Sequence, residues 1–216
     1  HDYRAMTAGL TDRVDPPSDN VFQSIDQTQL TWQSFQESMG GNCGVQTSQT
    51  VPGTNKALYS RGHDAAYLYR ANETCDTNDV PLISDTQLGN LPDFSVIIPN
   101  LCDDMHTYPP TGACPAYFGD VSGSNTRLIG DAWLQHVVPT ILTDPSVTVI
   151  VTFDEGTAKS AQHIYAVEVG AGVDAGATDS TLYDHYGLLA GIYEAFGLGT
   201  APNNASTATP FPIPPR

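Results

Sequence analysis

The segment 147–153, with the sequence VTVIVTF, constrains the fold most, because a nearly continuous run of β-branched and apolar residues is typical of a buried strand. Further strands are expected at 93–98 and 164–169, and the stretch LTWQSFQE alternates like a half-buried strand. Apolar residues at helical spacing between 128 and 141 separate two of these runs. Parallel neighbours need a crossover, so we predict an α/β fold with a mostly parallel sheet sandwiched by helices. We expect residues 1–216 to form one domain with a proline-rich tail over 200–216.

The charge of the chain excludes several classes of partner. It has 24 acidic and 8 basic residues, a net charge of -16, and no apolar run long enough to predict a transmembrane segment. Such a charge repels nucleic acids and anionic lipid headgroups, so we expect no nucleic-acid partner. A phosphate-binding site would need a local cation to reverse this field.

The cysteines favour disulfides over a zinc site, because no C-x-x-C pair is present. They are Cys43, Cys75, Cys102 and Cys114. We favour the pairs 43–75 and 102–114, since each closes a loop rich in Gly, Pro, Thr and Asn; four buried free thiols are the alternative. Disulfides predict an oxidising compartment, and two Asn-x-Ser/Thr triplets, at Asn72 and Asn204, are compatible with a secreted, extracellular protein.

Carboxylates and imidazoles follow the predicted strands. These residues are Asp154 and Glu155, then Asp103, Asp104 and His106, then Asp184 and His185. The carboxyl ends of parallel strands meet at one sheet edge, where ligands bind, and such side chains suit divalent metals. Taken singly, each group is explained equally well by a strand that ends in solvent or by an Asx turn.

Several blocks in order resemble a known family. LPDFSVIIPNLCDDMH, GDAWLQHVVPTIL, VTFDEG and YDHYGLLAGIYEAFGL, preceded by LTWQSFQESM and YSRGHDAAYLY, resemble the bacterial phosphoesterase family. That family contains secreted acid phosphatases and non-haemolytic phospholipases C. The resemblance implies an alkaline-phosphatase-like architecture and metal-dependent hydrolysis of phosphate esters through a phosphorylated Ser or Thr.

The resemblance also assigns roles to individual residues. It implies that a divalent metal is held by Asp154, Glu155, Asp104, His106 and His185. It implies catalytic roles for His63 and His106, with His63 contacting phosphate or protonating the leaving group. His136 and His163 fall outside the matching blocks, and we expect them to be core or surface residues.

The first residues depart from the family pattern. HDYRAMTAG resembles the continuation of a Ser/Thr-Leu-Pro-Asn-Tyr block that carries the nucleophile. We therefore expect the nucleophile, the first strand and part of the metal shell to lie upstream of His1. An N-terminal segment of the same protein is then an expected partner.

Three functions are consistent with these observations. A secreted phosphomonoesterase is favoured, because the short CDDMHTYPPTGAC loop predicts a tight site for a phosphorylated small molecule. A phospholipase C or phosphodiesterase would bind a lipid headgroup or a diester and needs an apolar rim. A catalytically inactive remnant is the third hypothesis, since the expected nucleophile lies outside the chain.

Overall fold

The computed structural model describes residues 2–11, 19–70, 74–106, 110–156 and 163–215. The chain divides into two compact units. The first combines residues 1–29 with 144–216, and the second spans residues 30–143. The expectation that residues 1–216 form a single domain stays a prediction.

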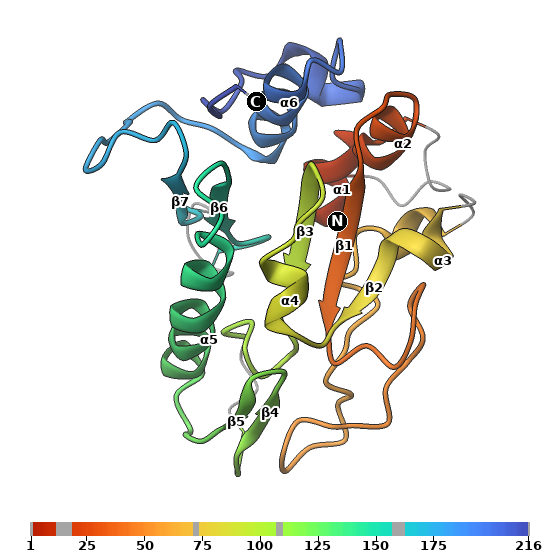
Figure 1. The fold of residues 1–216 in the computed structure, drawn as a ribbon, viewed down its shortest axis with the longest axis vertical. Coiled ribbons are helices and arrows are strands. Elements are labelled where there is room, and N and C mark those ends of the chain that lie inside the picture. The colour runs from red at the N-terminus through yellow and green to blue at the C-terminus, as the bar shows by residue number, and fades with distance from the viewer. Residues whose placement is uncertain (1, 12–18, 71–73, 107–109, 157–162, 216) are drawn as a thin grey trace. The chain divides into compact units, whose positions relative to one another are not determined.

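The second unit is built on a three-stranded parallel sheet in the order β2-β1-β3. Its strands are β1 (Trp32–Glu37), β2 (Asp79–Leu82) and β3 (Phe94–Ile98). Figure 1 shows β1 between its two neighbours. The predicted parallel sheet and the strand expected at 93–98 are confirmed. The half-burial expected for LTWQSFQE is wrong, because a central strand is covered on both faces and Ser34, Gln36 and Glu37 are buried.

Shorter elements complete the second unit. They are η1 (Tyr67–Tyr69), α3 (Cys75–Asn78), α4 (Asp85–Leu88), the antiparallel pair β4 (Cys114–Ala116) and β5 (Gly119–Val121), and α5 (Thr126–Ile141). Helix α5 begins where the Asn125 side chain accepts a hydrogen bond from the Arg127 amide at 3.1 Å. Its buried face repeats every fourth residue, at Ile129, Trp133, Val137 and Ile141.

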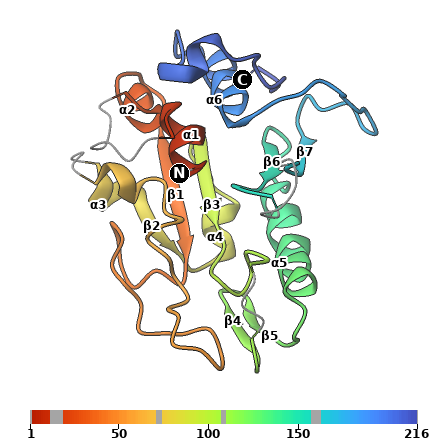
Figure 2. The same cartoon turned by 180° about the vertical axis from the view of Figure 1, so that it is seen from behind.

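The loops beyond the carboxyl ends of β1 and β3 have a core of their own. Figure 2 shows these segments beyond the arrowheads of the sheet, together with β4 and β5. Their buried cluster consists of Val51, Leu58, Leu101, Cys102, Cys114 and Ile129. Both predicted disulfides are confirmed, Cys43 with Cys75 and Cys102 with Cys114. The loops that follow the strands are therefore fixed against α5 and against each other.

The first unit contains a two-stranded antiparallel sheet. It pairs β6 (Thr148–Thr152) with β7 (Ala166–Gly170), Thr152 lying opposite Ala166. Strands near 147–153 and 164–169 are confirmed, but both were expected in a parallel sheet, whereas the structure pairs them antiparallel. A parallel pair needs a crossover, usually a helix, whereas the intervening residues 153–165 have no apolar stripe for one.

Helices form the remainder of the first unit. They are α1 (Asp2–Ala8), α2 (Val21–Asp26), α6 (His185–Phe196) and η2 (Asn203–Thr207). The tail packs along α6: the Phe211 amide donates to the Gly187 carbonyl at 2.9 Å. A side chain at Gly191 would overlap the Phe211 carbonyl, so only glycine allows this close approach.

Membrane-spanning helices, glycosylation sites and disulfides all bear on where the protein is found in or outside the cell. Within the described ranges, no helix has both the length and the apolar character needed to cross a bilayer. Asn72 lies outside the described residues, and Asn204 is exposed in η2. Paired cysteines are typical of proteins that fold in an oxidising compartment.

Candidate active site

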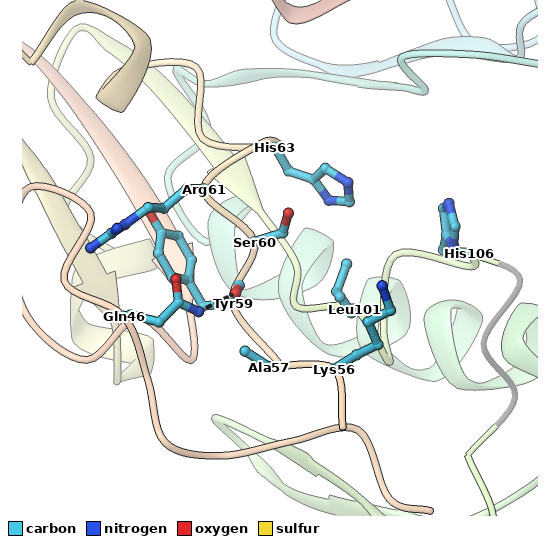
Figure 3. Close-up of a pocket in the computed structure, with 9 residues that line it drawn as sticks. All are labelled: Gln46, Lys56, Ala57, Tyr59, Ser60, Arg61, His63, Leu101 and His106. Atoms are coloured by element: carbon cyan, nitrogen blue, oxygen red, sulfur yellow. Dashed lines mark hydrogen bonds between the residues drawn. The ribbon is translucent and has the colours of Figure 1, made fainter. Parts of the chain in front are cut away.

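A pocket of about 400 Å³ lies in the second unit, in the loops at the carboxyl edge of the sheet. Its lining includes Lys56, Tyr59, Arg61, His63, Leu101 and His106. In Figure 3 the side chains of Lys56, His63 and His106 face a common space, whereas Arg61 extends the other way. Two of the chain's eight Lys and Arg residues thus line one pocket of a strongly acidic chain. These residues bring positive charge to the pocket, which an anionic ligand requires in so acidic a chain.

The two pocket histidines are both held by Asp104. Its Oδ2 atom lies 3.6 Å from Nδ1 of His63, and its Oδ1 atom accepts a hydrogen bond from the His106 amide at 2.8 Å. The imidazole rings are 6.3 Å apart between centroids. With Nδ1 of His63 toward the carboxylate, Nε2 is the nitrogen that can serve a ligand in the pocket. The structure therefore brings three of the predicted site residues together.

A buried carboxyl pair lies directly beneath this loop. Glu37 and Asp103 are 1% and 2% exposed, and Glu37 accepts hydrogen bonds from the amides of Asn100 and Tyr117, both at 3.0 Å. Burial raises the pKa of Glu37 to about 7, and burial together with the charge of Glu37 raises the pKa of Asp103 to about 9. Two carboxylates cannot donate to each other, and both Asp103 oxygens lack a hydrogen-bond partner; a proton shared with Glu37 would supply one of them.

A second such pair anchors the segment that carries His63. Asp64 and Asp79 are both fully buried, and burial raises the pKa of both carboxyls, that of Asp79 to about 8. Asp64 accepts hydrogen bonds from the Tyr59 hydroxyl at 2.5 Å and from the Tyr67 amide at 2.9 Å. A proton shared between the two carboxyls would link the irregular pocket segment to the start of β2. Sequence reasoning missed both pairs, because acidic residues are rarely buried.

In the first unit, the structure brings Asp154 and His185 together. Nε2 of His185 lies 2.6 Å from the backbone carbonyl of Asp154, just past the end of β6. A carbonyl can only accept, so Nε2 carries the proton of this hydrogen bond. Asp184 caps α6 by accepting from the Gly187 amide at 2.8 Å, which fixes His185 at the start of the helix. Glu155 is exposed.

The predicted metal ligands are thus divided between the two units. Asp104 and His106 belong to the second, and Asp154, Glu155 and His185 to the first. In the part of the chain that the structure describes, no three His, Cys, Asp or Glu side chains form a metal-binding group. Neither unit alone supplies a fitting donor set, so the convergence of these residues on one cation stays a prediction.

Comparison with known proteins decides the family. The profile of the phosphoesterase family matches residues 13–199. The chain belongs to the phosphoesterase family. The matched range includes the pocket and every predicted site residue, so the resemblance seen in the sequence is confirmed. The alkaline-phosphatase-like architecture stays a prediction, and no solved structure matches the chain.

One curated relative is named for an enzymatic activity. The phosphate-repressible acid phosphatase of Penicillium chrysogenum is 25% identical over 190 residues, which cover 81% of this chain and 41% of the relative. The chain therefore spans about two fifths of the length of this relative.

Proposed function

We propose that this protein hydrolyses phosphate esters and that the phosphoryl group of its substrate binds in the pocket lined by Lys56, His63 and His106. The arrangement of these three side chains in a chain of net charge -16 is the observation that carries the proposal. Cationic groups in a pocket favour a bound phosphate, and the phosphoesterase family membership supports the same chemistry.

Phosphomonoesters are the substrate class that we favour. Among the lining residues, only Ala57 and Leu101 are aliphatic, so the pocket offers little surface for acyl chains. The name of the Penicillium chrysogenum relative, an acid phosphatase, supports a monoester as well. The confirmed disulfides support secretion, because they require an oxidising compartment.

His63 is proposed as the general acid. As the bond between phosphorus and the leaving oxygen breaks, that oxygen takes the proton from Nε2 of His63, and the carboxylate of Asp104 holds the ring in place through its Nδ1 side. His106 donates to a phosphoryl oxygen. The attacking hydroxyl is that of the Ser or Thr nucleophile implied by the family resemblance; as its oxygen bonds to phosphorus its proton passes to solvent, and water then hydrolyses the phosphoenzyme.

A divalent metal remains part of the proposal. A bound cation would neutralise negative charge on phosphoryl oxygens, and the side chains proposed to hold it are Asp154, Glu155, Asp104, His106 and His185. The role of His63 given above does not depend on it, whereas His106 would donate to the phosphoryl oxygen from the ring nitrogen that does not bind the cation.

Turnover of two chromogenic esters tests the proposal. We expect the protein to release p-nitrophenol from p-nitrophenyl phosphate faster than from bis(p-nitrophenyl) phosphate. His63→Asn should lower kcat by about 100-fold or more, since general acid catalysis contributes roughly 10² to 10⁴. His136→Asn is the matched control, because His136 lies outside the pocket, beside Asp85 and Phe118. The protein assayed carries its nucleophile segment; absence of hydrolysis of either ester by that protein, or a wild-type rate in His63→Asn, would contradict the proposal.

A further inference from the structure

Lys56 is held in the pocket by its backbone. The Val51 amide donates to the Lys56 carbonyl at 2.8 Å, and the Lys56 amide donates to Oγ1 of Thr54 at 3.1 Å. Val51 and Leu58, on either side of this turn, are fully buried in the same cluster as Leu101. The base of the Lys56 side chain is therefore fixed relative to the segment that leads to His106.

Lys56 differs from the other cation of the pocket. The Arg61 guanidinium donates from Nε to the Gly44 carbonyl at 2.7 Å and lies 5.2 Å from the centre of the Tyr67 ring. Figure 3 shows it directed away from the histidines, whereas the Lys56 ammonium points to their side of the pocket. Arg61 thus has a structural role in bracing the loop. Lys56 is the permanent positive charge on the side of the pocket where the imidazoles lie.

A permanent charge discriminates between phosphate groups in a way that imidazoles do not. A phosphomonoester carries close to two negative charges at pH 7, since its second pKa is about 6, whereas a diester carries one. An imidazole N–H can donate to an oxygen of either group, and the dipole of a single N–H discriminates between the two less than a full positive charge does. The attraction of an ammonium is proportional to the charge it faces, so it strengthens binding of the monoester more.

We infer that Lys56 determines specificity in this pocket by selecting phosphate groups with two negative charges over diesters with one. The inference rests on the proposed function in assigning the phosphoryl group to this pocket. Lys56 is exposed, so replacing it leaves the core of the unit intact. No family block quoted above includes it.

Anion binding tests the inference without turnover. Inorganic phosphate and dimethyl phosphate are titrated by calorimetry, at low ionic strength, into the wild-type protein and into three variants. Lys56→Gln should weaken binding of inorganic phosphate by about 10- to 100-fold, as expected for loss of a charged hydrogen bond, and binding of dimethyl phosphate by about 3- to 10-fold, since half the charge gives half the attraction. Lys56→Arg should bind phosphate within about threefold of wild type. Arg127→Gln removes one exposed positive charge outside the pocket and should bind both anions like wild type.

Equal weakening of both anions in Lys56→Gln, or no weakening of phosphate binding, would overturn the inference. Turnover of p-nitrophenyl phosphate in the same preparations separates this failure from that of the proposed function. A protein that binds phosphate through Lys56 but hydrolyses neither ester disproves the hydrolase and leaves the anion site standing. A hydrolase that keeps its monoester preference in Lys56→Gln disproves the role of Lys56 alone.

Discussion

The carboxylate of Asp104 lies 3.6 Å from Nδ1 of His63. The same carboxylate accepts the amide of His106 at 2.8 Å, so a single residue sets the orientation of one pocket histidine and the backbone position of the other. This arrangement places Asp104 behind the histidines, where it orients the proposed general acid.

Replacing Asp104 by Asn should lower kcat/KM for p-nitrophenyl phosphate by about 10- to 100-fold, the usual cost of losing a carboxylate that orients a functional histidine. The fold should be retained, because the amide keeps the shape of the side chain. Steady-state kinetics measure the loss, and metal analysis of the purified variant separates two roles. Unchanged metal content would indicate an orienting carboxylate, whereas lost metal would indicate the metal ligand predicted from the family resemblance. Wild-type kinetics would exclude both roles.

Gly130 of α5 allows the helix to approach the site loop. A methyl group there would lie 2.6 Å from the Asp103 carbonyl and 2.5 Å from Cγ of Met105. Helix propensity alone favours Ala over Gly by about 1 kcal/mol, but overpacking a buried contact costs about 1–3 kcal/mol. We therefore expect Gly130→Ala to lower the free energy of unfolding, measured in urea, and to weaken phosphate binding. Leu128→Ala, at a position that is 66% exposed, is the control and should change stability by less than about 0.5 kcal/mol. An increase in the stability of Gly130→Ala would show that the loop carrying Asp103 and Met105 moves to make room for the added methyl group.

The disulfide between Cys102 and Cys114 spans the segment that bears Asp104 and His106. Closing a loop of this length stabilises a protein by about 3 kcal/mol. The double variant Cys102→Ser with Cys114→Ser should lose about that much unfolding free energy under oxidising conditions. Urea denaturation checks this, and a variant as stable as wild type would show that the buried cluster alone fixes the loop.

Stability should fall as pH rises, because the buried carboxyls bind their protons more tightly when folded. The pKa of Asp79 rises from 3.8 to about 8, so between these values the folded chain holds more protons than the unfolded chain. The unfolding free energy should then decrease with pH by at most about 1.4 kcal/mol per unit for one proton. This contribution is complete below about pH 4 and is lost as pH rises through 8.

Asp79→Asn tests the assignment, since the amide can still donate to Asp64 but does not titrate. Its stability should depend less steeply on pH between 4 and 8 than that of wild type. Asp131→Asn, which removes an exposed carboxylate from α5, should keep the wild-type slope. An unchanged slope in Asp79→Asn would assign the pH dependence to other groups, Glu37 and Asp103 among them.

Sequence patterns correctly predicted the features of the fold that depend on residues close together in the chain. The strand at 93–98 and the cysteine pairs were visible because apolar runs and loop composition are local signals. The direction of β7 was not, since a strand of five residues pairs equally well in either direction and the connecting segment decides.

The pocket was predicted only in part. His63, Asp104 and His106 stood out because imidazole and carboxylate followed a strand or matched a family block. Lys56 did not, because a single lysine in a loop carries no periodic signal. Its significance comes from its position beside two histidines in a chain that is otherwise acidic.

The most direct test of the pocket is a titration of inorganic phosphate followed through the imidazole resonances of the protein by NMR. We expect the resonances of His63 and His106 to shift together, with one saturable dissociation constant, because both rings face the bound anion. His136, whose Nε2 lies 2.9 Å from Asp85, is the internal control and should not move. Shifts of equal size at all three histidines, or none at His63 and His106 at saturating phosphate, would contradict the assignment of the phosphoryl group to this pocket.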